Sequence, residues 1–333
     1  MRTLFLLILL LPILSKCQNN NPNNEVMMEK ETISKWIKAV INVECQSNFF
    51  TSKLFVEMQS EEKNNPGKYT KEYRNKIQSN YLKKRYTGTA IYFLHKKKHY
   101  LISARHVLED VEASIQPEIY DLIFLRPNGS DLIDGKILEQ DTNYAHYIRT
   151  SARQKLNQIP FIFSSKEIDL AIVSLNDIPV YGPQFINTLK NKGYVPITLS
   201  DIDTLGNISK NDKILAVGFP NFSEIQQKKL SMDYLNWQSF VISIPVISKG
   251  IVEDVTNDTY SYFTGNIFVY RGFSGGPVIA DNKLIGISRS YGAFRIKSDN
   301  ISLGYYLFEK TIFTKTKFIM PMLGELENRL KQN

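Results

Sequence analysis

From residue 86 onward, the chain is a succession of short apolar, β-prone runs separated by turn signals, and this pattern constrains the fold more than any other feature. Turn residues interrupt the runs, as at Pro127–Gly129 and Asp281–Asn282. The predicted strands are 89–94, 100–102, 122–125, 170–175, 214–217, 240–246, 267–270, 278–280 and 284–287. Many short strands separated by turns at regular intervals favour antiparallel sandwiches or barrels over alternating βα units, so we predict an all-β fold.

Helical patterns are confined to the flanks of this β-rich region. The spacing of apolar residues predicts helices over Ile33–Val40 and Tyr69–Lys84. A C-terminal helix is predicted because three leucines fall on one helical face: Leu323, Leu326 and Leu330. The stretch Asn176–Pro196 is rich in proline and glycine, and we interpret it as the connector between two β domains.

The N-terminus has the pattern of an export signal. Arg2 precedes the eleven-residue apolar run Leu4–Leu14, which is shorter than the roughly 20 residues that span a bilayer. Cleavage after Cys17 would leave two small residues, Ser15 and Cys17, at the positions that matter for cleavage. We therefore expect a signal peptide over residues 1–17, an Asn-rich linker over 18–32, and a protein that is secreted or held in the cell envelope, in the periplasm or outside the cell.

A lipoprotein is the alternative reading of the same segment. Cys17 would then be lipidated and would tether the chain to a membrane through the Asn-rich stretch that follows it. Lys16 argues against this reading, because the residue before a lipidated cysteine is normally small. In either case Cys45 has no partner in the mature chain, and we expect it to be a small buried residue without a disulfide.

Charge and composition exclude several classes of protein. The chain is 43 % hydrophobic and 22 % charged, which is typical of globular domains, and two cysteines are too few for a disulfide scaffold or a four-cysteine zinc site. The net charge of +8 is concentrated between residues 61 and 105, where 12 Lys and Arg face 3 Glu. No nucleic-acid motif accompanies this run, so we expect a solvated insertion and no nucleic-acid partner. The rival is a polyanion-binding or envelope-binding protein that uses Lys63–Arg85, with affinity that falls steeply as salt rises.

The segment Gly272–Pro277 carries the sharpest chemical signal. A serine on a glycine-rich turn exposes its hydroxyl beside backbone N–H groups, which can stabilise a negatively charged carbonyl oxygen. The same letters fit the nucleophile elbow of α/β-hydrolases, but that fold places its histidine after the serine, and all four histidines here precede Ser274. An ordinary hairpin turn is the structural alternative.

A serine nucleophile needs an imidazole base and a carboxylate that orients it. His106 follows a predicted strand, and Asp169 opens another, so the order His, Asp, Ser has separations of 63 and 105 residues. The subtilisin order fails because no Asp precedes His106. A structural histidine and a strand-edge turn residue remain the alternatives. His95 and His99 flank a lysine-rich hairpin tip as expected exposed turn residues, while the fourth histidine, His146, lies in a polar segment.

These candidates stand within longer motifs that occur in a fixed order. The motifs are Thr87–Ala90, Leu101–Val107, Asp169–Val173 and Gly272–Val278, with Asp212–Pro220, Ser248–Val252 and Leu284–Ser288 in the second half. Over residues 86–292 this combination resembles trypsin-like serine peptidases, and above all their bacterial Do-like and glutamyl-endopeptidase-like branch. The resemblance implies a chymotrypsin-like double antiparallel β-barrel with short helices near the N-terminus and at the C-terminus, and with the site between the barrels.

The resemblance also implies roles for individual residues. His106 is the expected general base, Asp169 its orienting carboxylate and Ser274 the nucleophile, with the backbone N–H groups of Gly272 and Ser274 as the oxyanion hole. Phe268 and Ser288 are the candidate substrate-binding residues, and no metal or cofactor is expected. Phe268 is not acidic, which gives no support to a preference for Lys or Arg.

Domain boundaries follow from the same likeness. We expect the first barrel over 33–180 with insertions at 46–85 and 112–166, a connector over 181–196, and the second barrel with the C-terminal helix over 197–333. The 43 residues after Ser290 are too few for an appended PDZ domain. Phe273 stands where this family usually has Asp or Asn, so activation by pairing with a new N-terminus is not expected.

The expected function is therefore an exported serine endopeptidase that hydrolyses proteins or peptides through an acyl-enzyme. The alternative is a catalytically silent protein-binding module on the same fold.

Overall fold

The computed structural model describes residues 22–81, 84–126, 147–150, 159–205, 207–220, 224–226, 241–255, 259–298 and 301–332. Contacts divide the chain into two units, 1–36 and 37–333. Helix α2 (Pro22–Ala39) covers the described part of the first unit, and its last three residues belong to the second. Every other element discussed below belongs to the second unit.

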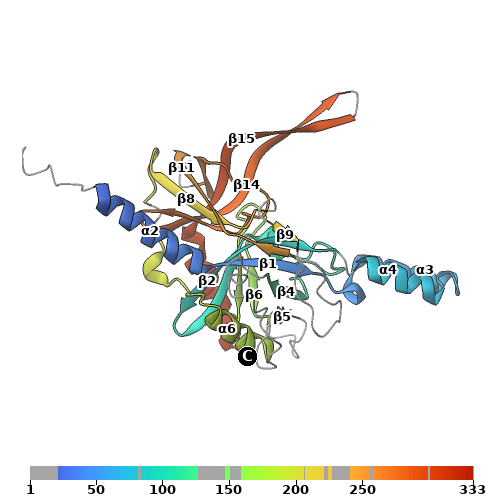
Figure 1. The fold of residues 1–333 in the computed structure, drawn as a ribbon. Helices are drawn as coiled ribbons and strands as arrows, with labels where there is room; N and C mark the ends of the chain where they lie inside the picture. Colours follow the sequence, from blue (N-terminus) through green and yellow to red (C-terminus); the bar gives the residue numbers. More distant parts are fainter. Residues whose placement is uncertain are drawn as a thin grey trace, which may run out of the picture. The chain divides into compact units, whose positions relative to one another are not determined.

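The first half of this unit is a seven-stranded antiparallel sheet in the order β5-β4-β1-β2-β3-β7-β6 (Figure 1). The strands are β1 (Val40–Gln46), β2 (Tyr86–His95), β3 (Lys98–Ser103), β4 (Leu122–Leu125), β5 (Tyr147–Arg149), β6 (Phe161–Phe163) and β7 (Ala171–Ser174). The turn between β2 and β3 consists of Lys96 and Lys97, both with positive φ, as two-residue hairpins require. Tyr92, Leu101 and Val173 are fully buried in the core of this sheet.

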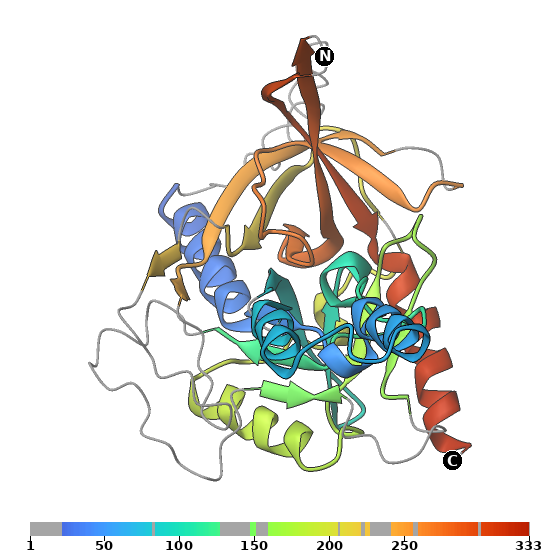
Figure 2. The same cartoon turned by 90° about the vertical axis from the view of Figure 1, so that its right-hand side faces the viewer.

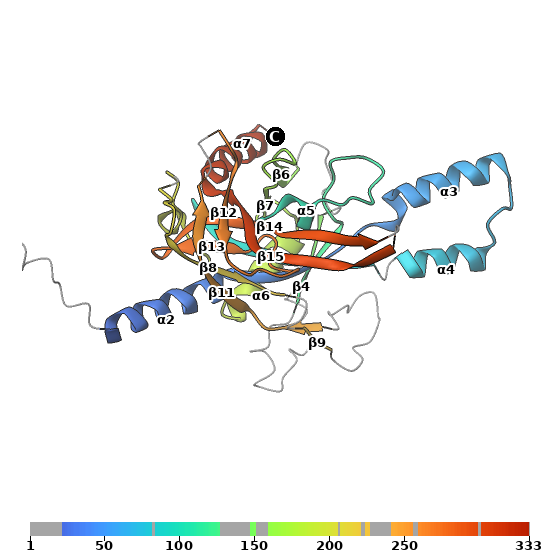
Figure 3. The same cartoon turned by 90° about the horizontal axis from the view of Figure 1, so that it is seen from above.

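The second half is a closed six-stranded barrel in the order β11-β12-β15-β14-β13-β8. Its strands are β8 (Lys213–Gly218), β11 (Val246–Asp254), β12 (Tyr262–Asn266), β13 (Pro277–Ala280), β14 (Lys283–Ser298) and β15 (Ile301–Lys315). Phe263, Phe273 and Phe313 are fully buried in its core. Beyond the barrel, β14 and β15 continue as a long two-stranded hairpin (Figure 3), and β9 (Glu224–Gln226) pairs with β10 (Val241–Ser243) as a separate ribbon.

Helices occupy the segments between strands and the C-terminus. The predicted insertion at 46–85 holds a short 3-10 turn η1 (Phe49–Thr51) and two helices, α3 (Lys53–Asn64) and α4 (Lys71–Tyr81). The predicted connector holds α6 (Tyr181–Asn191), which buries Phe185 and Leu189. The remaining elements are α5 (Arg105–Leu108), η4 (Leu199–Asp201), η6 (Thr316–Phe318) and α7 (Ile319–Lys331).

Helix α7 ties the end of the chain to the first sheet (Figure 2). It buries Leu323 and Leu326, as the sequence pattern predicts. Tyr100 Oη donates a hydrogen bond to Glu327 Oε1 over 3.2 Å. Arg329 donates to the carbonyl oxygens of the neighbouring β6 region. None of the helices in the described ranges has the length and apolar character needed to cross a membrane.

The prediction of a mostly β, double-barrel fold is confirmed, with a half-barrel sheet in the first half and a closed barrel in the second. Two predicted strands are wrong. The range 267–270 is irregular and follows β12, and the described part of 240–246 divides between β10 and the first residue of β11. Ile267 and Val269 are buried by loop packing, which explains their apolar character without strand pairing. Cys45 is free and buried, and burial raises the pKa of its thiol.

Candidate active site

The turn that carries Ser274 lies between β12 and β13 and depends on two glycines with positive φ, Gly272 at 105° and Gly275 at 85°. A Cβ at Gly275 would lie 2.0 Å from Thr89 O and 2.1 Å from Ser103 Oγ, so no side chain fits there. The turn is closed by its own backbone, since Gly276 N donates to Phe273 O over 2.8 Å. Ser274 is therefore held at a fixed place with its side chain half-buried.

Strand β2 of the first sheet holds this turn from the other side. Thr89 N donates to Ser274 O over 2.9 Å, and Thr89 Oγ1 donates to Gly272 O over 2.7 Å. The same hydroxyl accepts a hydrogen bond from Phe219 N over 3.2 Å. Thr89 is fully buried, so these bonds join the two halves of the unit at the Ser274 turn. Thr89 belongs to the motif Thr87–Ala90, but nothing in the sequence of that motif indicates these bonds.

Phe273, the unexpected residue before the serine, is a core residue of the second barrel. Its side chain is fully buried, and a Cβ at Gly218 would lie 2.8 Å from it. The Phe273 ring thus fills space left by a glycine on β8. Its N–H donates to Tyr270 O over 3.0 Å, which leads the backbone into the turn.

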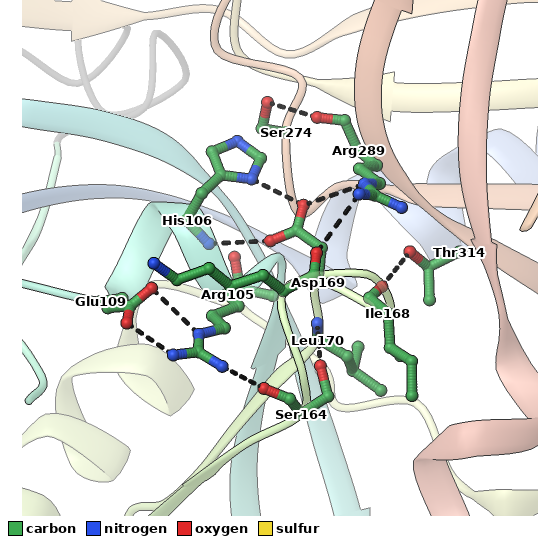
Figure 4. Close-up of polar contacts among 12 residues, drawn as sticks. Arg105, His106, Glu109, Ser164, Ile168, Asp169, Leu170, Ser274, Arg289 and Thr314 are labelled. Atoms are coloured by element: carbon green, nitrogen blue, oxygen red, sulfur yellow. Dashed lines mark hydrogen bonds and ion pairs between the residues drawn. The ribbon is translucent and has the colours of Figure 1, made fainter. Parts of the chain in front are cut away.

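His106 and Asp169 are in direct contact. Asp169 Oδ2 lies 2.8 Å from His106 Nδ1, and Asp169 Oδ1 accepts a hydrogen bond from His106 N over 3.0 Å (Figure 4). The two carboxylate oxygens therefore fix both the ring and the backbone of His106. Because Nδ1 donates to the carboxylate, Nε2 is the nitrogen left to accept a proton. The His106 side chain is 48 % exposed, whereas that of Asp169 is 8 % exposed.

Local structure holds each of these two residues in place. Helix α5 begins at Arg105, whose guanidinium pairs with Glu109 over 2.6 Å and donates to Ser164 O. Pairing with Glu109 raises the pKa of Arg105. Asp169 has φ 58°, an uncommon value for a residue with a side chain, and its N–H donates to Ser165 O over 3.0 Å. Arg105 N donates to Asp169 O over 3.2 Å, which links the two segments directly.

The Ser274 hydroxyl donates to the backbone oxygen of Arg289 over 3.3 Å. Among the residues that the structure describes, no hydrogen bond joins this hydroxyl to the His106 ring. Figure 4 draws the His106 ring on the same side of the Asp169 carboxylate as the Ser274 side chain. A rotation of the serine side chain would redirect its hydroxyl, and catalytic hydrogen bonds are often made only when substrate is bound.

Arg289 is the site residue that the sequence analysis missed. Its Nε lies 3.6 Å from Asp169 Oδ2, and its two terminal nitrogens donate to Glu167 O over 2.7 Å and Lys166 O over 3.3 Å. The only available signal was a basic residue two positions after the apolar run Leu284–Ile287, and that signal does not indicate a partner.

The other predicted site residues are placed as follows. Within the described part of the chain, no acceptor is recorded for the backbone N–H groups of Gly272 and Ser274. Phe268 is 40 % exposed and stacks on Tyr270 at a ring distance of 6.2 Å. Ser288 is buried, and over the same described ranges its hydroxyl has no hydrogen-bond partner. Their roles in catalysis and substrate binding stay predictions.

The expectation for two of the remaining histidines is wrong. His95 is the last residue of β2 and His99 is the second residue of β3, so neither forms the turn, and neither is exposed. His99 Nδ1 lies 2.7 Å from Tyr92 Oη, and burial lowers the pKa of both imidazoles. His146 lies outside the described residues. No cluster of three or more potential metal ligands occurs in the part of the chain that the structure describes.

A comparison with curated proteins found no match. The pattern of the trypsin-like peptidase domain matches residues 88–287, which is more than half of the chain and extends from β2 through the nucleophile turn to the beginning of β14. This chain belongs to the trypsin-like peptidase domain family.

Proposed function

We propose that this protein is an exported serine endopeptidase that cleaves proteins or peptides through an acyl-enzyme on Ser274. The observation that carries the proposal is the contact of 2.8 Å between His106 Nδ1 and Asp169 Oδ2, in a half of the molecule whose Thr89 also holds the Ser274 turn. Membership of a peptidase family supports hydrolysis of peptide bonds. The family match does not assign the catalytic residues, so the roles of His106, Asp169 and Ser274 are part of this proposal.

The reaction proceeds in two steps. The Ser274 hydroxyl leaves Arg289 O, transfers its proton to His106 Nε2 and bonds to the substrate carbonyl carbon. The carbonyl oxygen becomes negative and receives hydrogen bonds from the N–H groups of Gly272 and Ser274. His106 then gives the proton to the leaving amine, and the peptide C–N bond breaks. In the second step His106 takes a proton from water as the water oxygen bonds to the acyl carbon. The bond from that carbon to Ser274 Oγ then breaks, His106 returns the proton to Oγ, and the acid is released. Asp169 stabilises the imidazolium in both steps.

The finer assignments rest on the sequence. The motifs in the second half support the Do-like and glutamyl-endopeptidase-like branch, and the apolar run after Arg2 supports export. Lipidation of Cys17 would place the same enzyme on a membrane surface. Phe268 and Ser288 are proposed to contact the substrate side chain, and since neither is acidic, we expect no preference for Lys or Arg.

The test is covalent labelling of the purified protein with a fluorophosphonate probe. Such a probe reacts with a serine only where its base and oxyanion hole are assembled. We expect labelling of wild type and of Ser79→Ala, which removes an exposed serine on α4, but not of Ser274→Ala. Labelling that persists in Ser274→Ala would contradict the assignment of the nucleophile. A folded wild-type protein that takes no label would favour a silent binding module instead.

A further inference from the structure

Arg289 contacts both the proposed nucleophile and the proposed orienting carboxylate. Its backbone oxygen accepts a hydrogen bond from the Ser274 hydroxyl, and its guanidinium forms an ion pair with Asp169 at 3.6 Å (Figure 4). A β-bulge makes this double contact possible, because the register of β14 against β15 shifts between Ser288 and Ser290 and leaves Arg289 as the extra residue. Bulges commonly redirect a side chain beside a functional site.

The guanidinium also grips the segment that leads to Asp169. It donates hydrogen bonds to the backbone oxygens of Lys166 and Glu167, which lie three and two positions before Asp169 along the chain. An arginine side chain has five N–H donors in a rigid plane, which allows it to bind two carbonyl oxygens and a carboxylate together. A lysine at the same place would keep the charge but would lose the planar arrangement of donors.

This segment needs such support because its backbone is in an uncommon conformation. The φ of 58° at Asp169 lies in the left-handed region, which a residue other than glycine keeps only when its surroundings hold it there. Two further bonds from the second barrel act on the same backbone. Ser261 Oγ donates to Glu167 O over 3.0 Å, and Thr314 Oγ1 donates to Ile168 O over 2.7 Å. The second barrel therefore holds the segment that presents Asp169 to His106.

The guanidinium does not help the reaction through its charge. A cation beside Asp169 weakens the negative potential that stabilises the imidazolium of His106 during the reaction. Its benefit must then come from orientation, since an Asp169 carboxylate that turns away releases both His106 Nδ1 and the His106 backbone N–H.

We propose that Arg289 is a positioning residue that holds Asp169 in the orientation that hydrogen-bonds His106, and so couples the second barrel to the base of the first. This inference rests on the proposed function of the same site. It adds a residue besides His106, Asp169 and Ser274 that affects the turnover rate.

The test compares Arg289→Ala and Arg289→Lys with wild type in steady-state hydrolysis of a peptide ester. We expect kcat to fall on the order of 10- to 100-fold in Arg289→Ala with KM changed less than about twofold, since small misplacements of catalytic groups cost that much in rate. Arg289→Lys should regain part of kcat. Added guanidinium at millimolar concentration should raise kcat of Arg289→Ala several-fold, whereas sodium chloride at equal ionic strength should not. Arg74→Ala, which removes an ion pair between the exposed Arg74 on α4 and Glu62 on α3, is the matched control and should match wild type.

A second readout does not depend on turnover. The proton between His106 Nδ1 and Asp169 Oδ2 should give a low-field proton NMR signal that is lost in His106→Gln. We expect Arg289→Ala to broaden or abolish this signal through exchange with water. Unchanged kcat and an unchanged signal in Arg289→Ala would overturn the positioning role. Loss of kcat without guanidinium rescue, together with a lower Tm, would also overturn it in favour of general stabilisation. A wild-type protein that shows the signal but neither turns over ester nor takes the fluorophosphonate label would refute the proposed function and leave the placement of Asp169 by Arg289 intact.

Discussion

Thr89→Val tests how the two halves of the molecule meet at the nucleophile turn. Valine has nearly the shape of threonine, so the change removes one hydroxyl and leaves the volume unchanged. The lost group donates to Gly272 O over 2.7 Å and accepts from Phe219 N over 3.2 Å at a fully buried position. Each of the two buried groups left without a partner costs about 1–3 kcal/mol, so we expect the free energy of unfolding to fall by about 2–6 kcal/mol.

Thr89→Ser is the matched control because it keeps the hydroxyl and removes the methyl group. That methyl group packs toward Gly276, where a Cβ would lie 3.3 Å from Thr89 Cγ2. Burial of one such group is worth about 1 kcal/mol. The smaller side chain should therefore be the less damaging one, which is the reverse of what a volume argument predicts. Freed from Thr89, the Gly272 carbonyl should also let the turn relax, and the rate of fluorophosphonate labelling should fall in Thr89→Val more than in Thr89→Ser.

Urea unfolding followed by far-UV circular dichroism measures these differences in the free energy of unfolding. The slope of that free energy against urea concentration should be the same in all three proteins. A loss below about 0.5 kcal/mol in Thr89→Val, or a larger loss in Thr89→Ser than in Thr89→Val, would refute the reasoning. Either result would mean that the buried carbonyl and N–H find other partners when the hydroxyl is removed.

Three further predictions concern the nucleophile, its turn and a buried carboxyl. Ser274→Ala should lower kcat for a peptide ester on the order of 10⁶-fold. In stopped-flow measurements, wild type should show a burst phase from accumulation of the acyl-enzyme, and the variant should show none. Gly275→Ala should unfold at distinctly lower urea than wild type, since its Cβ would lie 2.0 Å from Thr89 O at a φ of 85°, whereas Gly324→Ala in α7, where nothing lies within 4 Å, should be neutral or stabilising by up to about 1 kcal/mol. Burial raises the pKa of Asp110 to about 6, so the folded state binds a proton that the unfolded state does not between about pH 4 and 6. The stability of wild type relative to Asp110→Asn should therefore fall as pH rises through that range, and an equal pH dependence in both proteins would argue against it.

The sequence predicted strands correctly where apolar residues are continuous. The prediction failed where a strand contains polar residues that are buried by partners distant in the sequence. The ranges 122–125 and 214–217 correspond to β4 and β8 because these strands are short apolar runs between turn residues. Strand β1 was missed, although all of its residues are buried, because Asn42 and Glu44 interrupt the apolar pattern. Glu44 is buried with Arg126 at 2.7 Å and Arg85 at 3.1 Å, and no local pattern indicates those two cations.

The candidate site divides in the same way. His106, Asp169 and Ser274 stand in motifs with a characteristic order, so they could be selected before any distance was known. Arg289 could not, because its contacts with Asp169 and with the backbone at residues 166–167 exist only once the second barrel is packed against the first. Thr89 lies between these cases, since its motif was visible but its bonds to a turn 183 residues away were not.

The bonds from Thr89 to the Ser274 turn have a consequence for the order of events in folding. A contact between residues 183 positions apart closes a very long loop, and such contacts form late because the entropy of closure must be met first. The turn can therefore take its final shape only after both barrels exist and have docked. We expect a chain that is still emerging or refolding to lack a shaped Ser274 turn, so that an enzyme with the proposed function could not attack its unfolded neighbours. In a refolding experiment, recovery of fluorophosphonate labelling should trail the recovery of β-sheet signal, and the interval between them measures the time that docking takes.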